Sequence, residues 1–438
     1  MNDVIKKYTW NPALNLFLTM KEKVQENMRN TSDLPEEQKD ILHYWSEYLA
    51  ANGEPVYKEI ISNLLIVQYK EFLLLHYNFI NQFDGNPDDF WDMYDGLYME
   101  CRSVVIDTKN NCLALVPFRK FRNLNEGKGC MLADIQERLK KAKHVEISEK
   151  LDGSMMSARW YDGKLLMASS QALNPGTSWR LADAIRMFYE DLHYTEMLMS
   201  NPEKTFIFEY ISKKDAHVVQ YDQEGLFLIG MRCVDDVFTG IGGMEFSYKS
   251  VIEIAQKYRI PATKTFDKTL DQVLTELDDK KANEAEGFVV DIDGFKVKVK
   301  YNDYVSMHKM LTKLGSVNCI IRAIADDTYD DLLSKIPEAY RKRIEVIGKD
   351  VLQIKEVYED AVDIIISSYN KWISLAPIND SDKTFADFVN KICPKDFRGY
   401  AFCKRKNKPY NVLKDGYRYK KWKDLYPAIN LNDVLEEP

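Results

Sequence analysis

The most informative part of the sequence runs from Val145 to Ser154 and reads Val-Glu-Ile-Ser-Glu-Lys-Leu-Asp-Gly-Ser. It joins one strand-like run to a second that begins near Ser157, and its Asp-Gly pair is typical of a turn. A lysine at the end of a strand, partly desolvated and close to other cations, has a lowered pKa, so Lys150 is a candidate nucleophile. The alternative is an ordinary turn preceded by a solvated lysine.

Strand signals surround this stretch from about Tyr98 to Tyr304. Short runs rich in Val, Ile, Phe and Tyr alternate there with turn residues. The clearest predicted strands cover residues 103–107, 145–149, 157–160, 164–168, 205–211, 226–231, 287–292 and 295–299. Asp-Gly pairs at 162–163 and 293–294 predict tight hairpins. We therefore expect an antiparallel sheet core with interspersed helices.

Helical patterns flank the strand region on both sides. Residues 36–50 and 59–77 contain no glycine or proline and are predicted to be helical. After Tyr304 the apolar residues step by three or four, which predicts a separate helical module. Its apolar stripe consists of Ile347, Val351, Ile354, Tyr358, Ala361, Ile365, Tyr369 and Trp372. Residues at this spacing are expected to pack in a core.

Charged residues stand in or beside predicted strands where a purely structural sheet would have apolar ones. Arg102 and Lys120 precede Lys150, whereas Glu209 and Glu286 follow it. A carboxylate such as Glu209, on an otherwise apolar strand, is desolvated unless it binds something. These residues are candidates for a polar site.

Three lysines alternate along the last predicted strand. Lys296, Lys298 and Lys300 are two residues apart, so their ammonium groups are expected on one face. A triphosphate bound at this face would offset their mutual repulsion. An exposed edge strand that lysines protect from aggregation is the alternative.

This ordered series resembles the covalent nucleotidyltransferase superfamily of ATP-dependent ligases and capping enzymes. It is most similar to the RNA ligase 1 family, of the bacteriophage tRNA-repair type. The resemblance covers about Tyr98 to Met310, and its motifs are residues 150–154, 208–210, 286–289 and 298–300. Arg102 and the stretch 120–123, Lys-Phe-Arg-Asn, are similar to signatures of that family alone.

The resemblance implies an α+β fold with two domains. An antiparallel-sheet nucleotidyltransferase (ATP-grasp-like ligase) domain, with a helical N-terminal part, is expected over residues 1–305. An all-helical C-terminal RNA-specificity domain with a basic aromatic tail is expected over residues 306–438. Such a domain helps to select the broken RNA, but its sequence does not reveal which RNA.

The implied activity is ATP-dependent joining of 5'-phosphate and 3'-hydroxyl RNA ends. Lys150 would attack the alpha phosphate of ATP, and the AMP would then pass to the RNA 5'-phosphate before the 3'-hydroxyl displaces it. The expected cofactors are ATP and Mg²⁺ or Mn²⁺. The expected partner is RNA with such ends. A tRNA cut in its anticodon loop is the candidate substrate, and an end-healing polynucleotide kinase/phosphatase is a candidate second partner.

The resemblance also assigns roles to residues. The catalytic residues would be Lys150, Lys298 and Lys300, and the metal ligands would be Glu286 and Glu209. The nucleotide would contact Arg102, Lys120, Lys150, Asp152, Gly153, Glu209, Lys298 and Lys300. For Glu209 the nucleoside and metal roles remain open.

Two positions are uncertain within this scheme. The family has a lysine in the strand after the first motif, but residues 167–171 here read Met-Ala-Ser-Ser-Gln. No site residue is carried over there. His217 is either a nucleotide or RNA contact or a solvated loop histidine.

A basic segment near the C-terminus covers residues 391–423 and interleaves Lys and Arg with Phe, Tyr and Trp. That mixture is suited to phosphate contacts and base stacking. Alternatively, it is a solvated basic surface whose aromatic rings pack onto the helical module.

Composition and the remaining motifs exclude other classes. The chain has 438 residues and a net charge of -8, so any RNA contact must come from local patches. No P-loop or dinucleotide-binding glycine motif is present, which argues against a kinase or P-loop NTPase. We expect a cytoplasmic protein of a bacterial cell or a phage-infected host, with no membrane association. A DNA ligase or mRNA guanylyltransferase would need an OB-fold after residue 304, where the pattern is helical. A non-catalytic RNA-binding protein on a ligase fold is the other alternative.

Overall fold

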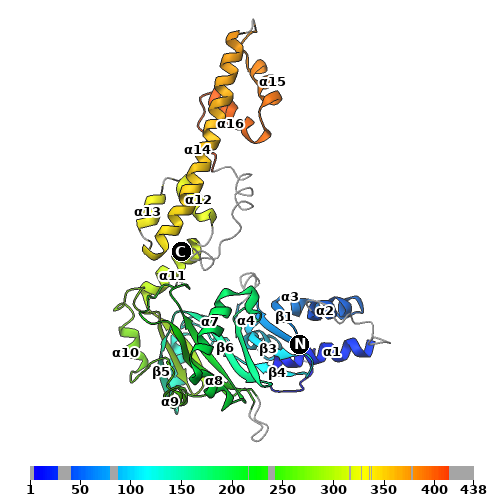
Figure 1. Cartoon of the computed structure of the whole chain (residues 1–438), viewed down its shortest axis with the longest axis vertical. Coiled ribbons are helices and arrows are strands. Elements are labelled where there is room, and N and C mark those ends of the chain that lie inside the picture. Colours follow the sequence, from blue (N-terminus) through cyan, green and yellow to red (C-terminus); the bar gives the residue numbers. More distant parts are fainter. Residues whose placement is uncertain are drawn as a thin grey trace. The chain divides into compact units, whose positions relative to one another are not determined.

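The computed structural model describes residues 4–27, 41–78, 87–215, 217–234, 242–314, 317–326, 328–334, 336, 338–375 and 378–413. The chain divides into two compact units, Met1–Val305 and Ser306–Pro438. Both contribute helices, but all the described strands lie in the first unit, which is therefore a mixed α and antiparallel β structure (Figure 1).

The first unit contains three antiparallel sheets of four strands each. The N-terminal sheet has the order β1 (Leu64–Tyr69), β2 (Phe72–Tyr77), β3 (Arg102–Asp107) and β4 (Cys112–Leu115). The second has the order β10 (Thr265–Phe266), β5 (Val145–Lys150), β11 (Gly287–Ile292) and β12 (Phe295–Lys300). The third has the order β7 (Lys164–Ser169), β6 (Ser154–Tyr161), β8 (Lys204–Ile211) and β9 (Gly225–Cys233).

The eight strands predicted from the sequence are confirmed. Both Asp-Gly hairpins are confirmed too, because Asp162, Gly163, Asp293 and Gly294 all have positive φ between β6 and β7 or between β11 and β12. The connection from β5 to β6 is only three residues long, so the chain passes from the second sheet to the third directly after Lys150.

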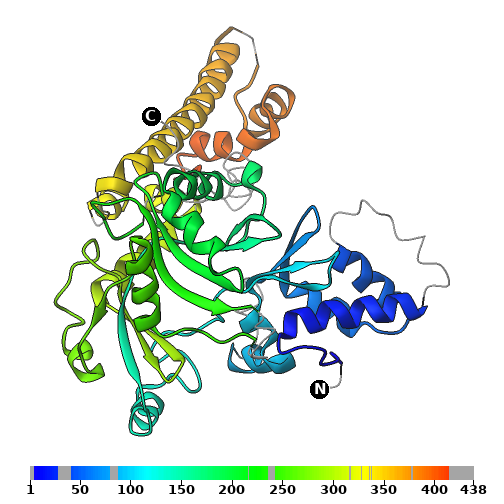
Figure 2. The same ribbon diagram turned by 60° about the horizontal axis from the view of Figure 1, so that its bottom comes forward.

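Helices cover these sheets. They are α1 (Pro12–Asn27), α2 (Ile41–Ala51), α3 (Val56–Ser62), α4 (Pro87–Asp92), the 3-10 turn η3 (Met93–Asp95), α5 (Leu97–Glu100), α6 (Leu132–Leu139), the 3-10 turn η4 (Pro175–Thr177), α7 (Trp179–Glu190), α8 (Leu192–Met199), α9 (Tyr248–Tyr258) and α10 (Leu270–Thr275). The turned view in Figure 2 shows the N-terminal helices beside the N-terminal sheet.

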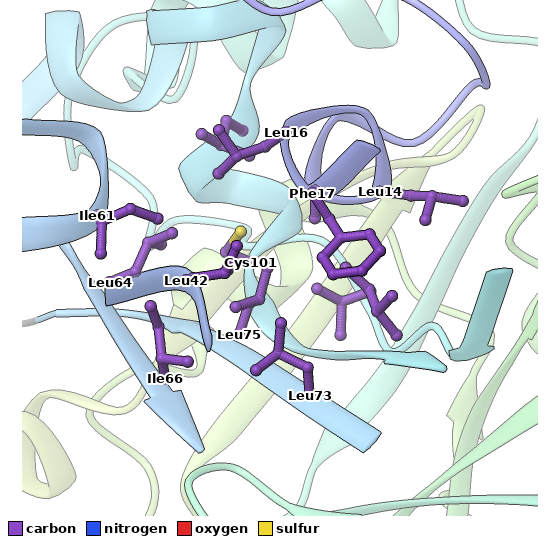
Figure 3. Packing of buried hydrophobic residues seen from close by; sticks show 14 of the residues in the cluster. Leu14, Leu16, Phe17, Leu42, Ile61, Leu64, Ile66, Leu73, Leu75 and Cys101 are labelled. Atoms are coloured by element: carbon purple, nitrogen blue, oxygen red, sulfur yellow. The ribbon is translucent and has the colours of Figure 1, made fainter. Parts of the chain in front are cut away.

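The N-terminal helices and sheet share one apolar core. Leu16 and Phe17 of α1, Leu42 of α2, and Leu73 and Leu75 of β2 are fully buried in the same cluster (Figure 3). Burying a leucine or phenylalanine side chain stabilises a fold by about 1.5–3 kcal/mol. This cluster therefore holds β2 and β3, and with them Arg102, in place.

The predicted helix over residues 59–77 is wrong. The chain forms α3 and then a hairpin of β1 and β2, whose turn places Lys70 at φ +55. All six residues of β2 are buried, so its sequence shows a continuous apolar run instead of alternation. The other predicted N-terminal helix is confirmed as α2, although residues 36–40 lie outside the described part of the chain.

The second unit is helical throughout its described residues. Beyond α11 (Asn302–Leu314), which crosses into it, the helices are α12 (Val317–Ala325), α13 (Tyr329–Ser334), α14 (Glu338–Leu375), α15 (Asp382–Ile392) and α16 (Lys395–Arg405). The predicted apolar stripe lies on α14, where Ile347, Val351, Ile365 and Tyr369 are buried and only Trp372 is more than a third exposed. The described part of this unit contains no strand and hence none of an OB-fold.

None of the described helices is long and apolar enough to cross a membrane.

Candidate active site

Lys150 ends β5 and is held by a carboxylate from the neighbouring strand. Its Nζ lies 2.8 Å from Glu286 Oε2 and donates a hydrogen bond to Leu151 O at 2.9 Å. Glu286 Oε1 lies 2.8 Å from Lys300 Nζ, so one buried carboxylate binds both lysines. The predicted residues Lys150, Glu286 and Lys300 are thus brought together.

Strand register explains this arrangement. Because β11 lies between β5 and β12, Gly287 faces Lys150 on one side and Lys300 on the other. Gly287 has φ +150, and a Cβ there would lie 2.2 Å from Val299 O. The absence of a side chain lets the three strands pack closely at the point where Glu286 enters the site.

The pKa of Lys150 is opposite in direction to the sequence-based prediction. Burial lowers it, but the carboxylates of Glu286 and Glu209 outweigh burial and raise the pKa above the usual lysine value. The predicted lowering is therefore wrong for the unliganded protein, because the closest charges are carboxylates and not cations. Lys150 is an ammonium ion in this state.

Glu209 lies in β8 of the third sheet and reaches the same site. It is buried, and its pKa is raised because desolvation and the charge of Glu286 outweigh the attraction of Lys150. Gly153 allows β8 to approach closely, since a Cβ there would lie 2.5 Å from Tyr210 O and 2.9 Å from Glu209 Cγ. The second and third sheets therefore meet at Lys150.

A cavity of about 260 Å³ opens beside Lys150 and Glu209. Its walls combine apolar side chains with polar and charged ones. Its lining includes Phe118, Phe121, Met155, Ile229 and Val289 together with Arg102, Ser148, Glu149, Ser154, Ser170 and Thr263. This combination suits a flat heterocycle with a charged substituent that points toward Lys150.

A cationic cluster adjoins the cavity. Burial, reinforced by the charges of Arg102, Lys150, Lys120 and Lys300, holds the pKa of Lys298 well below its usual value. Lys298 and Arg102 both lie against the ring of Phe121, at 4.6 and 5.3 Å from its centroid. Such a concentration of buried positive charge favours a polyanionic ligand.

Two members of the cluster come from the N-terminal sheet region. Arg102 begins β3, and its buried Nη1 has no hydrogen-bond partner among the described residues. Lys120 lies over the rings of Tyr77 and Trp91, 5.0 Å from each centroid, and burial together with Arg102 lowers its pKa to about 8. An unpaired buried guanidinium nitrogen is costly without a ligand.

The stretch after Lys120 is attached to the edge of β12. Lys298 N donates to Arg122 O at 3.0 Å, and Leu124 N donates to Lys298 O at 2.8 Å. This pairing positions Phe121 next to Lys298 and covers the edge of the sheet. The sequence signature at 120–123 is thus part of the site through its backbone as well as its side chains.

Lys296 does not join the phosphate-facing lysines. It is buried and lies 2.6 Å from Glu245 Oε2 and 2.9 Å from Asp291 Oδ2. The alternative of an exposed protective edge is wrong, because Lys296 is buried and has carboxylate partners of its own. These partners also separate Lys296 in charge environment from Lys298 and Lys300, although all three alternate along β12.

Asp152 and Gly153 lie beside Lys150 in different roles. Asp152 Oδ2 accepts from Val219 N at 3.0 Å and Asp152 Oδ1 from Tyr304 OH at 2.9 Å. The Asp152 carboxylate is thus directed to protein donors, whereas Gly153 lines the cavity. Tyr304 was not identified from the sequence, because an isolated tyrosine after a strand carries no signal of its own.

His217 is not a solvated loop residue. Its side chain is 20% exposed and lies between Asp152 and Asp215. The segment 167–171 contributes Ser170 to the cavity and no cation.

The described part of the basic segment packs into the helical unit. Phe397 stacks on Tyr358, Phe402 contacts Phe385, and Arg405 lies 2.7 Å from Asp380. These contacts favour a structural role over base stacking for residues 391–413. Residues 414–423 lie outside the described part.

A lysine flanked by carboxylates, beside a cavity and a cationic cluster, defines a site suited to nucleotidyl transfer through a lysine. Residues 100–307 match the sequence model of a protein family described as RNA ligase. Over these residues the match confirms the resemblance found in the sequence.

Solved structures that match parts of the chain include those of one RNA ligase and of a putative DNA ligase. Naegleria gruberi RNA ligase with PPi matches at 17% identity and a TM-score of 0.32, covering 40% of this chain and 55% of that one. A mutant of the same enzyme with ATP and Mn matches at 17% identity and a TM-score of 0.35, covering 45% and 61%. A putative ATP-dependent DNA ligase from Aquifex aeolicus matches at 13% identity and a TM-score of 0.38, covering 79% of each chain. The chain thus spans less than two thirds of the Naegleria chain.

Proposed function

We propose that the chain is an ATP-dependent RNA ligase that joins a 5'-phosphate to a 3'-hydroxyl through a lysyl-AMP and an RNA-adenylate. The observation that carries this proposal is the position of Lys150, which lies in a matched RNA ligase domain between two glutamates and beside a cationic cluster. A nucleophile within hydrogen-bonding distance of a base is the usual arrangement in covalent catalysis.

In the first step Lys150 attacks the alpha phosphorus of ATP. Glu286, at 2.8 Å, is positioned to accept the ammonium proton. The Nζ–P bond forms, the bond from the alpha phosphorus to the bridging oxygen breaks, and pyrophosphate leaves with the electron pair. The cavity takes the adenine against its apolar side chains and brings the alpha phosphate to Lys150.

The cationic cluster stabilises the phosphates. Lys298 and Lys300 act on the alpha phosphate as its charge develops, and Arg102 and Lys120 hold the phosphates that leave. Two observations support these roles. A bound polyanion would give Nη1 of Arg102 a hydrogen-bond partner, and its negative charge would raise the lowered pKa values of Lys120 and Lys298.

Glu286 and Glu209 fit a divalent ion that accompanies ATP. Within the described residues no three His, Cys, Asp or Glu side chains form a metal site, and Mg²⁺ is commonly held by one or two carboxylates together with substrate phosphates. Mg²⁺ or Mn²⁺ would supply positive charge that neutralises the phosphates.

In the later steps the AMP passes to an RNA 5'-phosphate, and the RNA 3'-hydroxyl then displaces it. The helical second unit is proposed to select the RNA, with tRNA as the first candidate and an end-healing kinase/phosphatase as the enzyme that prepares the ends. Such a reaction would take place in the cytoplasm.

The test is incubation with alpha-labelled ATP and magnesium after removal of any bound AMP with pyrophosphate. Wild-type protein and Lys164→Ala, which changes an exposed lysine, should form an acid-labile AMP adduct, whereas Lys150→Ala should not. The charged enzyme should then seal 5'-phosphate RNA in preference to DNA of the same sequence. A stripped wild-type protein that forms no adduct would leave only a non-catalytic RNA-binding role.

A further inference from the structure

His217 connects two buried carboxylates behind the Lys150 loop. Its Nε2 lies 3.0 Å from Asp215 Oδ2, and its Nδ1 lies 3.5 Å from Asp152 Oδ1. Asp152 and Asp215 are themselves buried. The imidazole therefore bridges the loop after β8, which carries Asp215, and the loop after β5, which carries Asp152.

Both carboxylates hold the backbone next to Lys150. Asp152 is two residues from Lys150 and is fixed by Val219 and Tyr304. Asp215 Oδ2 accepts from Ser154 Oγ at 2.6 Å, and Asp215 Oδ1 lies 2.8 Å from Arg180 Nε. Asp152 carries one of the two carboxylates that His217 joins, and Ser154 donates a hydrogen bond to the other.

The charges of this network alternate: Arg180 is positive, Asp215 negative, His217 positive and Asp152 negative. Burial alone would lower the pKa of His217, but its bonds to Asp152 and Asp215 raise it to about 10. The bonds to His217 likewise outweigh the burial of both aspartates and lower their pKa values to about 2. The imidazole is consequently an imidazolium ion at neutral pH.

The other buried histidine shows that burial does not by itself produce this state. His76 accompanies Arg102 and Lys120, and burial together with these cations lowers its pKa to about 3. His217 is therefore charged because Asp152 and Asp215 lie beside it. Removing one member of a buried ionic network leaves the others uncompensated.

We propose that His217 is a positioning residue for the first step, because its bridge between Asp152 and Asp215 fixes the loop that aims Lys150 at the alpha phosphate. The inference rests on the proposed ligase function. Sealing of an RNA that is already adenylated does not use Lys150 as a nucleophile. It therefore does not depend on how Lys150 is positioned toward the alpha phosphate.

The test compares formation of lysyl-AMP with sealing of pre-adenylated RNA. His217→Ala should lower the rate of adduct formation at saturating ATP at least tenfold and change KM for ATP less than threefold. The rate of sealing pre-adenylated RNA should stay within threefold of wild type. His217→Gln, which keeps a donor for only one carboxylate, should fall between the two.

Asp215→Asn keeps the test decisive if His217→Ala does not fold, because it removes the same bridge by an isosteric change and should give the same split. His193→Ala is the matched control. His193 also follows an aspartate by two residues and lies 2.7 Å from Asp191 Oδ1, but its side chain is 45% exposed and it lies on α8 instead of in the network of Asp152 and Asp215. It should leave both rates unchanged.

Equal losses in both assays from folded His217→Ala or Asp215→Asn would overturn the positioning role. A wild-type rate of adduct formation in either folded variant would also overturn it. Failure of the wild type to form any adduct would instead overturn the proposed function, and this inference with it.

Discussion

Glu286 Oε2 lies 2.8 Å from Lys150 Nζ, so the proposed nucleophile is stored as an ammonium ion beside its own proton acceptor. Glu286 also binds Lys300, which means that a single carboxylate compensates one lysine on each neighbouring strand. In the unliganded site Glu286 thus compensates two lysines, and the proposed substrate ATP would meet cations that are only partly neutralised.

The first prediction concerns this pair. Glu286→Gln removes the charge that most raises the pKa of Lys150, while the lowering effect of burial remains. The pKa should fall by about one unit or more, which makes the free amine about tenfold more abundant below the pKa. Competitive acetylation over a pH series, with peptide mass spectrometry and without ATP or metal, measures the change.

Glu196→Gln serves as its control, since Glu196 is exposed on α8 and should leave the labelling of Lys150 unchanged. An unaltered titration of Lys150 in Glu286→Gln would contradict the electrostatic account of the site.

A second prediction concerns the close approach of the third sheet to the Lys150 loop. In Gly153→Ala the new methyl group would lie 2.5 Å from Tyr210 O, so the loop or β8 must move. Displacements of about 1 Å can reduce catalysis about 10²-fold. The rate of lysyl-AMP formation should fall at least tenfold and is measured with alpha-labelled ATP.

Gly129→Ala is a useful comparison because a Cβ at residue 129 would have no atom within 4 Å, and the cost of the substitution comes only from φ +80. Its adenylation rate should remain near that of wild type. Similar rates for Gly153→Ala and wild type would show that the loop tolerates the shift.

A third prediction concerns the buried ion pair of Arg232 and Glu100. Arg232 Nη1 lies 2.6 Å from Glu100 Oε1 and donates to Pro117 O at 2.9 Å. Arg232→Met removes both contacts of Arg232 with this buried carboxylate but leaves Arg119, whose Nε lies 3.3 Å from Glu100 Oε2. The free energy of unfolding should therefore fall by about 3 kcal/mol, the lower end of the range for breaking a buried ion pair. Urea unfolding followed by tryptophan fluorescence measures the loss.

The exposed pair of Lys58 and Glu47 provides the contrast. Lys58→Met should change stability by less than about 1 kcal/mol. Equal effects at the two pairs would mean that the buried pair is not the stabilising element that its geometry indicates.

Much of the site could be predicted from the sequence because each motif places its charged residue in or next to a strand. Lys150 ends β5, Glu286 precedes β11 and Lys300 ends β12, so correct strands also bring these three side chains together. Turn chemistry determined the two hairpins, since Asp-Gly readily adopts positive φ.

The predictions from sequence failed for features that depend on residues far away in the chain. The β1–β2 hairpin has neither alternation nor a glycine turn, because tertiary burial covers both faces of β2. The pKa of Lys150 depends on Glu209 and Glu286 from other strands. His217 acquires its charge from Asp152, a partner that no local pattern connects with it.

The last prediction uses the lowered pKa of Lys120. Its pKa is about 8 in the folded protein and 10.5 ordinarily, so between these values the unfolded chain binds more protons than the folded one. Stability of the unliganded protein should therefore rise as pH increases from 8 to 10.5, with Lys120 contributing about 2–3 kcal/mol. Urea unfolding of wild type and Lys120→Met over this range measures that contribution as the difference between their slopes. Lys140→Met, at an exposed lysine, should keep the wild-type slope. Parallel curves for wild type and Lys120→Met would contradict a Lys120 that is destabilised by burial and by Arg102 until a polyanion binds.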